Sequence, residues 1–484
     1  MAVFAVAEST PAILQRLARE GFEVRAVDAV AGTAGDAAGT AEIAQAKQAG
    51  WIVTDGYSFG VEYQRRIKDK VPNLLCVDDN GEAGGFVADV ILNQNLHARR
   101  GLYREREPGA RLLLGPRYGL LRREFKPWLS WQRATRGEAS RVLVTMGGSD
   151  ALNLSERVIR AIQSRSMGNL EITVVAGGSS PHLAGLRAMR EELGSGLRLM
   201  MDVNDMPELM AWADVAVSAA GSTCWEMCRL GLPAIVIDVA LNQGPLAGEL
   251  EREGVAIHVP LSQATGAQIA EKLEGLMRSR GLRARMAKRG AELVDGLGAW
   301  RVVAAMRAQA IRVRRAQAGD CRILWEWANE RAVRQASFES AAIPWEQHSR
   351  WFEQKLGDPA STVLMFEEDG STPAGTVRFQ ATTSGDAEIS VTVGPEFRGQ
   401  GLAPYFLDRA VERVFELSSL ERIHAYIRVE NPASAKSFEP AGFFLVGTTQ
   451  IKGNEALHYV RERERVANIG VGDTDKAVET ARCR

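Results

Sequence analysis

The chain has 484 residues, of which 45% are hydrophobic and 25% are charged, and its formal net charge is −1. These values are ordinary for globular proteins, and the length predicts about three domains. The near-neutral charge argues against nucleic acid as the main partner. No run of about eighteen apolar residues and no signal-peptide pattern occurs, so we expect a cytoplasmic protein with no membrane partner. The five cysteines and six histidines lack metal-ligand spacing, and no metal site is predicted.

Strand-like and helix-like segments alternate in the first part of the chain. A Gly/Ala-rich connection interrupts this series, whose segments are 3–7, 11–21, 22–28, 41–50, 51–57, 61–70, 74–80 and 88–94. Such alternation predicts a parallel sheet covered on both faces, that is, a Rossmann-like domain over residues 1–135. Ligands of these sheets gather at the carboxyl ends of the strands, where Asp55, Tyr57, Asp78 and Asp79 fall.

A second α/β series follows a junction at 112–125 and a helix or linker at 128–138. Its strand-like segments are 141–150, 171–180, 197–203, 213–219 and 234–239. We therefore expect a second Rossmann-like domain at 136–308, with a cleft between the two domains. The segment Gly147–Asp150 closes the first of these strands, and it fits a phosphate-binding loop and a turn with an N-cap equally well.

The stretch 213–243 carries the strongest local signal for a ligand. It predicts a strand, a turn, a helix closed by Gly231 and Pro233, and another strand. The turn at Ala220–Ser222 offers the N–H groups of a helix N-terminus to an anion, with no side chain at Gly221 to obstruct it. Thr223 and Glu226 also fit a capping box that needs no ligand, and the local sequence alone favours this cap.

The pattern changes at Ile311, where a third domain is predicted over 309–461, followed by a polar tail at 462–484. Three strand-like segments joined by short turns, 362–369, 373–380 and 387–393, predict an antiparallel meander. The segment 397–415 then predicts a glycine-bearing turn that opens an amphipathic helix. The domain is therefore expected to be α+β.

This glycine-bearing turn resembles the R/Q-x-x-G-x-G/A motif of GCN5-related N-acetyltransferases, or GNAT proteins. Asn431, Ser434 and the segment Ala441–Phe443 follow at the spacing of that superfamily. The resemblance implies that acetyl-coenzyme A is the co-substrate, since turn and helix N–H groups bind its pyrophosphate. The acetyl-coenzyme A ligands it implies are Val391, Val393, Arg398, Gly399, Gln400, Gly401, Leu402, Ala403, Asn431, Ser434 and Phe438.

Acetyl transfer requires a base for the amine, and Glu388 is the candidate; a solvent-facing strand residue is the equal alternative. Phe438 stands where many members of the superfamily have a tyrosine that protonates the leaving thiolate. A narrower resemblance, to acetyltransferases of the 4-amino group of nucleotide-linked amino sugars, rests on Trp327, Asn329, Arg334, His348, Trp351 and Phe352. Plain helix packing is the alternative for these residues.

The front half resembles the nucleotide-sugar domain of GT-B proteins, particularly the MurG-like group. The residues that carry this resemblance are Gly221–Thr223, Glu226, Gly231–Pro233 and Asn242–Gln243. It implies that the loop and helix bind uridine diphosphate (UDP), that Glu226 binds ribose and that Asn242–Gln243 lie at the sugar. The implied UDP and sugar ligands are Asp55, Gly147, Gly148, Ser149, Gly221, Ser222, Thr223, Glu226 and Gln243.

Further segments, 55–57, 74–79, 88–95, 114–125 and 144–153, resemble the UDP-sugar hydrolases of pseudaminic acid biosynthesis, a pathway linked to flagellin glycosylation. These enzymes release UDP from UDP-2,4-diacetamido-2,4,6-trideoxy-β-L-altropyranose. The resemblance implies catalytic roles for Tyr57 and Asn242, which would position sugar and water. Loop N–H groups and a helix dipole would stabilise the departing UDP.

Two departures from that family affect the expected hydrolysis. The family has a G-x-G-H-x-x-R motif after its first strand, whereas the first histidine here is His97, and the opening of the chain matches the family's second strand and helix. The amino end is thus expected to be short by one strand-loop-helix unit, with a misplaced start codon as the alternative explanation. Gly56 also stands where relatives often have histidine. As given, the sequence predicts UDP-sugar binding with inefficient hydrolysis.

Together the resemblances predict a bifunctional nucleotide-sugar enzyme. The third domain would acetylate the 4-amino group of a UDP-2-acetamido-4-amino-trideoxy sugar, and the first two would release UDP from the product. The alternatives are a GT-B glycosyltransferase fused to an acetyltransferase, and an inactive UDP-sugar-binding module that feeds the acetyltransferase. Sugar stereochemistry and oligomeric state are not predicted.

Overall fold

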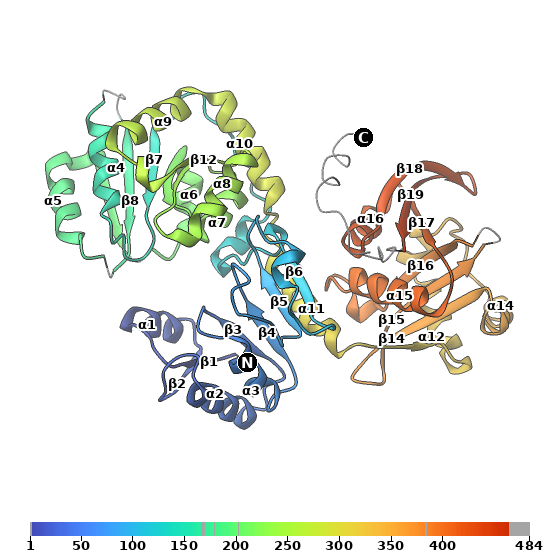
Figure 1. Cartoon of the computed structure of the whole chain (residues 1–484). Coiled ribbons are helices and arrows are strands. Elements are labelled where there is room, and N and C mark those ends of the chain that lie inside the picture. The colour runs from blue at the N-terminus through green and yellow to red at the C-terminus, as the bar shows by residue number, and fades with distance from the viewer. Residues whose placement is uncertain (1, 166–169, 179, 202, 383–384, 464–484) are drawn as a thin grey trace, which may run out of the picture. The chain divides into compact units, whose positions relative to one another are not determined.

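The computed structural model describes residues 2–165, 170–178, 180–201, 203–382 and 385–463. The chain divides into two compact units, one up to Met306 (unit 1) and one from Arg307 onward (unit 2). Most of the predicted polar tail lies outside the described residues. Both the Rossmann-like architecture of the front half and the α+β architecture of the rest are confirmed (Figure 1).

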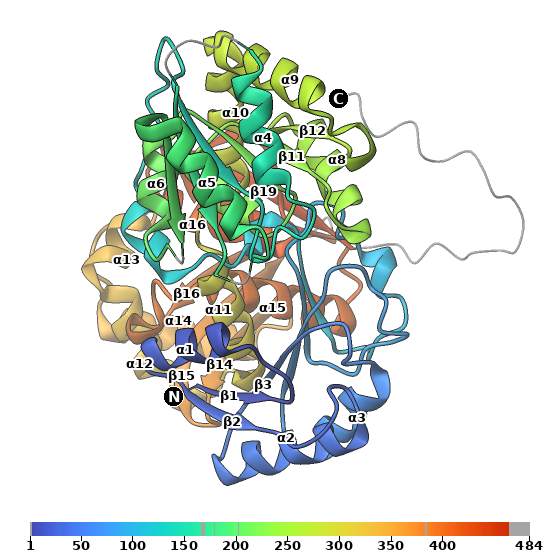
Figure 2. The same cartoon turned by 90° about the vertical axis from the view of Figure 1, so that its left-hand side faces the viewer.

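The first part of unit 1 is built from parallel strands, as predicted, but they form two sheets and not one. β3, β4, β5 and β6 form a four-stranded sheet in sequence order, while β1 and β2 pair only with each other. Figure 2 shows that pair beside α2. The bounds are β1 Val3–Val6, α1 Pro11–Arg19, β2 Glu23–Ala26, α2 Ala34–Ala46, β3 Ile52–Asp55, α3 Val61–Lys68, β4 Leu74–Val77, β5 Val90–Asn93 and β6 Arg111–Leu114.

The Gly/Ala-rich connection also differs from its prediction, because most of it is helical. Thr33 caps α2 by accepting a hydrogen bond from the N–H of Asp36. Ala37, Ala41 and Ala44 are buried in the core that α2 and α3 form over the four-stranded sheet. Small side chains allow the two helices to approach closely, so this composition serves packing and not a loop.

The second part of unit 1 is a six-stranded parallel sheet with the order β12-β11-β10-β7-β8-β9. One face packs against α4, α5 and α9, and the other against α6, α7 and α8 (Figure 1). This doubly wound arrangement brings the carboxyl ends of β7 and β10 side by side. The bounds are β7 Arg141–Thr145, α4 Leu154–Gln163, β8 Glu171–Ala176, α5 Leu183–Leu193, β9 Leu197–Met201, α6 Met206–Trp212, β10 Val215–Ala219, α7 Thr223–Arg229, β11 Ala234–Ile237, α8 Gly244–Arg252, β12 Ala256–Val259, α9 Gly266–Arg278, α10 Arg280–Leu293 and α11 Gly298–Ala310.

Unit 2 is a seven-stranded sheet with the order β13-β14-β15-β16-β17-β19-β18, antiparallel except for the pair β16–β17. The predicted meander is β14, β15 and β16. α12 and α14 pack on one face of the sheet, and α15 packs on the other through the stacked pair Phe366–Phe406. The bounds are β13 Arg312–Arg315, α12 Cys321–Asn329, α13 Arg331–Ala336, α14 Trp345–Gly357, β14 Ser361–Glu368, β15 Thr372–Ala381, β16 Ala387–Val393, α15 Ala403–Leu417, β17 Arg422–Arg428, α16 Pro432–Phe438, β18 Phe444–Ile451 and β19 Asn454–Glu462.

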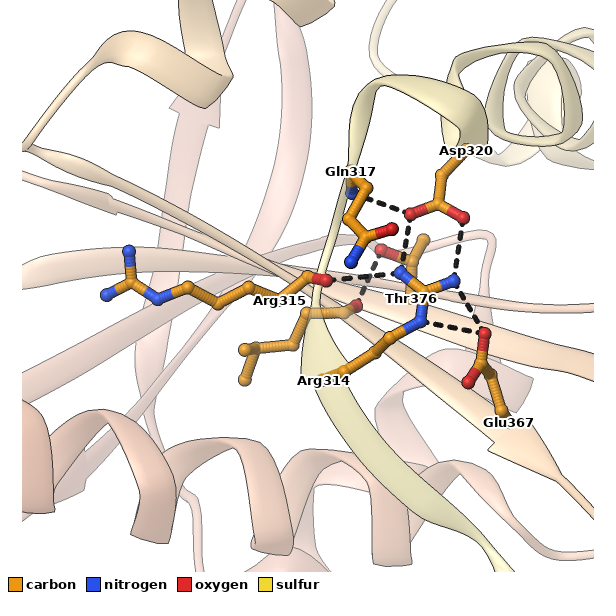
Figure 3. Close-up of polar contacts among 7 residues, drawn as sticks. Arg314, Arg315, Gln317, Asp320, Glu367 and Thr376 are labelled. Carbon is orange, nitrogen blue, oxygen red and sulfur yellow. Dashed lines mark hydrogen bonds and ion pairs between the residues drawn. The ribbon is translucent and has the colours of Figure 1, made fainter. Parts of the chain in front are cut away.

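Arg314, Asp320 and Glu367 form a cluster of charged side chains that links the start of unit 2 to its sheet (Figure 3). Arg314 donates to both carboxylate oxygens of Asp320, at 2.7 and 2.8 Å, and to Glu367 at 2.8 Å. Asp320 also accepts from the N–H of Gln317 at 2.7 Å. The two carboxylates, Asp320 first, raise the pKa of Arg314. Because every charge here has a partner within the cluster, we assign it a structural role.

Among the described residues, the longest apolar helices fall short of what a bilayer crossing requires. Within the same residues, no three His, Cys, Asp or Glu side chains converge in the way a metal ion would require.

Candidate functional sites

The turn between β10 and α7 has the predicted strand-turn-helix geometry. A Cβ added at Gly221 would meet only the Nε2 atom of Gln243, at 4.0 Å. The side chain of Gln243 therefore lies next to the turn. Its Oε1 atom accepts from the N–H of Val239 at 3.0 Å, which fixes the loop that follows β11.

The capping box favoured by the local sequence is wrong. The N-cap of α7 is Ser222, and no side chain caps the helix. Glu226 instead accepts from Nε and Nη2 of Arg122 at 2.6 and 2.7 Å. Burial raises the pKa of Glu226, and Arg122 opposes that rise. Both carboxylate oxygens of Glu226 are thus bonded to one partner, Arg122, and a ribose hydroxyl would replace one of these two hydrogen bonds.

Tyr57 and Asn242, the predicted catalytic pair of unit 1, are brought together although they lie in different Rossmann-like domains. Asn242 Nδ2 donates to the Tyr57 hydroxyl at 3.0 Å, and that hydroxyl donates to Asp79 at 2.8 Å. Asn95 Nδ2 donates to the other oxygen of Asp79 at 2.7 Å. Partial desolvation and the negative charge of Asp79 raise the pKa of Asp55. Polar groups thus gather at the carboxyl ends of β3, β4 and β5.

The segment Gly147–Asp150 bonds to the start of α4 through Asp150, although the N-cap residue of that helix is Asn153, whose side chain makes no capping hydrogen bond. The Asp150 carboxylate accepts from the N–H groups of Leu154 and Ser155 at 2.8 and 3.0 Å. Gly147 has a φ of +82°, a conformation that favours glycine. Ser149 is exposed on this turn. The first N–H groups of α4 therefore have a partner without any ligand.

The turn of unit 2 that resembles the acetyl-coenzyme A motif has positive φ angles, which glycine adopts readily, and no side chain obstructs it at Gly399. Gly399 and Gly401 both have a φ of +72°, and a Cβ at Gly399 would meet nothing within 4 Å. No side chain caps α15. Arg398 is fixed by Val393 and Glu330, yet its Nη2 atom is buried without a hydrogen-bond partner among the described residues. Gln400 donates to the carbonyl of Glu396, while Leu402 is buried and Ala403 begins the helix. These features fit a bound pyrophosphate.

β16 and β17 separate just before this turn. Only Ala387 and Glu388 of β16 pair with β17, and the rest of β16, including Val391 and Val393, pairs with β15 alone. Two parallel strands that diverge leave backbone groups free for a thioester chain. Glu388 is exposed at the last paired position, and its charge contributes to raising the pKa of Tyr426 after burial.

The other predicted ligands of acetyl-coenzyme A have local partners. Asn431 caps α16 by accepting from the N–H of Ser434 at 3.1 Å. Phe438 is buried and meets Phe443 edge to face, with ring centroids 5.0 Å apart. Phe438 therefore packs in the core. Its ring has no acidic proton, so it could not protonate the leaving thiolate.

The six residues that resemble sugar-amine acetyltransferases divide into two groups. Trp327, His348 and Phe352 are buried in or against the core of α12, α14 and β14, as the packing alternative describes. Asn329 exchanges hydrogen bonds with the backbone of Ile343. Arg334 donates to one carbonyl in α12 and to one that follows α13. Trp351 lies under Arg378.

Two parts of the chain match known families. Residues 311–444 match the family described as "Acetyltransferase (GNAT) domain". Unit 2 contains an acetyltransferase domain. Residues 141–296 match "Glycosyltransferase family 28 C-terminal domain", which agrees with the nucleotide-sugar type of the second Rossmann-like domain.

Three similar proteins illustrate the range of relatives. An uncharacterized protein of Methanocaldococcus jannaschii is 21% identical over 412 residues, 81% of each chain. The spore coat polysaccharide biosynthesis protein SpsG of Bacillus subtilis is 29% identical over 48% of this chain and 68% of its own. The "Pseudaminic acid cytidylyltransferase and UDP-2,4-diacetamido-2,4,6-trideoxy-beta-L-altropyranose hydrolase" of Helicobacter pylori is 25% identical over 42% of this chain and 37% of its own.

Sequence reasoning missed the partners of the predicted residues. Arg122 and Asn95 lie inside segments that carried a resemblance, and Asp79 was placed at a strand end, but none received a role. Arg122 lies 104 residues from Glu226, a separation no local pattern reports. A buried glutamate does need a cation, and that requirement is the one signal that could have prompted a search for an arginine.

Proposed function

We propose that unit 2 transfers the acetyl group of acetyl-coenzyme A to the 4-amino group of a UDP-2-acetamido-4-amino-trideoxy sugar, and that unit 1 releases UDP from the diacetamido product. The observation that carries this proposal is the presence of an acetyltransferase domain and a nucleotide-sugar-type glycosyltransferase domain in one chain. A substrate that both can use is a nucleotide-linked amino sugar. The alignment with the Methanocaldococcus jannaschii protein spans 412 residues, more than unit 1 contains, so it extends into unit 2.

In unit 2, the turn at Arg398–Leu402 and the N-terminus of α15 would hold the pyrophosphate of acetyl-coenzyme A. The separation of β16 and β17 would admit its thioester. Glu388, beside that opening, would face the amine. The proposal also includes four ligands of acetyl-coenzyme A outside this turn. Val391 and Val393 precede the turn in the sequence, and Asn431 and Ser434 follow it.

In unit 1, the turn at Gly221–Thr223 and the pair Glu226–Arg122 would hold UDP. Tyr57 and Asn242 would place the sugar and an attacking water, and Asp79 would keep the Tyr57 hydroxyl oriented through its hydrogen bond at 2.8 Å. The name of the Helicobacter pylori relative, which includes this hydrolase activity, supports the proposal for unit 1.

The decisive test supplies the purified chain with acetyl-coenzyme A and the UDP-amino sugar, and follows free thiol, UDP and product mass. We expect thiol first and UDP afterwards. Thiol without UDP would confine the activity to unit 2 and favour a binding role for unit 1. UDP release that requires an added acceptor would favour a glycosyltransferase. Thiol from a simple amine such as spermidine, but none with the sugar, would refute the sugar-amine substrate.

A further inference from the structure

Three titratable side chains form a continuous line on one face of the sheet of unit 2. Asp386 precedes β16, His424 lies on β17 and His458 lies on β19. His424 Nε2 is 3.1 Å from Asp386 Oδ2, and His424 Nδ1 is 2.9 Å from His458 Nε2. None of these residues belongs to a motif that the sequence suggested.

The hydrogen-bond donors and acceptors along this line can be assigned by starting from Asp386. An ionised carboxylate only accepts, so His424 Nε2 carries the hydrogen that faces Asp386. His424 Nδ1 is then an acceptor, and His458 Nε2 donates to it. The remaining nitrogen of neutral His458, Nδ1, therefore has a lone pair, and no hydrogen bond to it occurs within the described part of the chain.

The middle of this line, His424, lies where the opening between β16 and β17 begins, and His458 lies one strand further, on β19. Glu388 and His424 are the last paired residues of those two strands. Tyr426 lies two residues further along β17, past that pair, and His458 is its partner on β19. The rings of Tyr426 and His458 stack with centroids 4.8 Å apart. His458 thus lies beside the part of β17 that β16 has left.

Burial favours the neutral form of His458. Burial first, and after it repulsion from His424 whenever that ring is protonated, lower the pKa of His458 below its ordinary value of 6.5. Asp386 is also paired with Arg422 at 3.0 Å. On the same face, Glu388 contributes a negative charge, which also acts on Arg378 of β15.

We propose that His458, aligned by His424 and Asp386, accepts the proton of the substrate amine in the acetyl transfer. This inference rests on the function proposed for unit 2. One proton of the ammonium group passes to Nδ1 of His458 and on to solvent. The neutral nitrogen attacks the thioester carbon, and the C–N bond forms as the C–S bond breaks. The second proton, lost from nitrogen as the amide forms, protonates the departing thiolate.

This assignment changes the role of Glu388 from base to binding group. Its carboxylate is exposed at the opening, so it attracts the ammonium form of the substrate. A carboxylate that only attracts the amine affects KM, whereas the proton acceptor affects kcat and its pH dependence. His424 and Asp386 are positioning residues in this proposal, because they act on the amine only through His458.

The kinetic test uses the full chain with acetyl-coenzyme A and the UDP-amino sugar. We expect His458→Gln to lower kcat about 100-fold or more, a usual contribution of a general base, with the KM for acetyl-coenzyme A unchanged. Asp386→Asn is expected to lower kcat less and to move the acidic limb of the rate profile to lower pH, because His458 loses a nearby negative charge. Glu388→Gln should raise the KM for the sugar and keep that limb.

Chemical rescue separates a proton acceptor from a structural ring. Added imidazole should restore part of the activity of His458→Ala in a concentration-dependent way. Arg413→Gln, which removes an exposed ion pair with Glu416 on α15, is the matched control and should leave the rates unchanged. The proposal is overturned if Glu388→Gln abolishes the acidic limb while His458→Gln keeps it.

A second readout does not depend on turnover. If the wild-type chain releases no thiol with the sugar, the proposed substrate fails, and the relay is still examined by NMR of ¹⁵N-labelled histidine side chains. We expect His424 in the Nε2–H form and His458 titrating below pH 6.5. His424 in the Nδ1–H form, or no change of His424 in Asp386→Asn, would refute the relay itself.

Discussion

In unit 1 the polar side chains of the candidate site hold one another, whereas in unit 2 the glycine turn leaves its donors open. Glu226 is bound by Arg122, and Asp150 binds the first N–H groups of α4. In contrast, no hydrogen bond of the N–H groups of Gly399, Gly401 or Leu402 is found within the described residues. A ligand that binds Glu226 must therefore replace a hydrogen bond of Arg122, while a ligand of the unit 2 turn meets N–H groups that have no partner within the described residues. Substitutions should accordingly weaken ligand binding more in unit 2 than in unit 1.

The largest effect is expected for Gly401→Val in unit 2. A φ of +72° is unfavourable for a branched side chain, and reshaping the turn removes several N–H donors from the pyrophosphate at once. Each charge-assisted hydrogen bond is worth about 1.5–3 kcal/mol, so we expect the Kd for acetyl-coenzyme A to rise about 100-fold. Isothermal titration calorimetry measures it.

Gly453→Val is the matched control for that substitution. Gly453 has a φ of +77° in the turn between β18 and β19, with nothing near its added Cβ. It should lower stability by a similar strain and leave acetyl-coenzyme A affinity unchanged. Equal loss of affinity in both variants would show that strain, and not the loss of phosphate donors, explains the effect.

A smaller effect is expected for Glu226→Gln in unit 1. The ribose hydroxyls lose a charged acceptor, but Arg122 remains to meet the nucleotide, so the Kd for UDP should rise about 10-fold, near the lower end of a charged hydrogen bond. Glu274→Gln removes a comparable ion pair with Arg165, at 2.8 Å, and is the control. An unchanged Kd for UDP would place the ribose elsewhere and leave Glu226 a purely structural partner of Arg122.

The same contrast explains which features could be predicted from the sequence. Glycine turns, strand alternation and the change of pattern at Ile311 are local, and the structure reproduces them. The Arg122–Glu226 pair and the His424–His458 contact join distant segments, so no spacing rule reports them. The pairing of β1 with β2 alone also escaped prediction, since alternation indicates parallel strands but not which edges meet.

Asp150→Ala examines whether the start of α4 is capped or is a ligand site. Loss of the acceptor of two N–H groups should lower the stability of α4 by about 1–2 kcal/mol, in the range of a lost side-chain cap, which hydrogen exchange of its amides measures. The Kd for UDP should stay the same or fall, because a negative charge disappears and two N–H groups are freed. A rise in this Kd without faster exchange would instead assign Asp150 to UDP binding.

The smallest expected effect concerns stability, whose dependence on pH should have opposite signs for His458 in unit 2 and Glu226 in unit 1. The pKa of His458 lies below 6.5, so the unfolded chain takes up that proton first and unit 2 loses stability as pH falls below about 6.5. Burial, followed by the opposing effect of Arg122, leaves the pKa of Glu226 above 4.5, so the folded state takes up that proton first. The contribution of Glu226 to unit 1 therefore becomes more favourable as pH falls from the raised pKa toward 4.5.

Thermal unfolding of the full chain between pH 7.5 and 4.5 can separate these contributions. The transition of unit 2 is identified by its upward shift with acetyl-coenzyme A, and that of unit 1 by its shift with UDP. His458→Gln should reduce the acid-induced fall in Tm of unit 2, and Glu226→Gln should remove part of the acid-induced gain in unit 1, each by a few degrees. The same pH trend for both differences would contradict the contrast between the two sites, because it would require both groups to bind their protons more tightly in the same state.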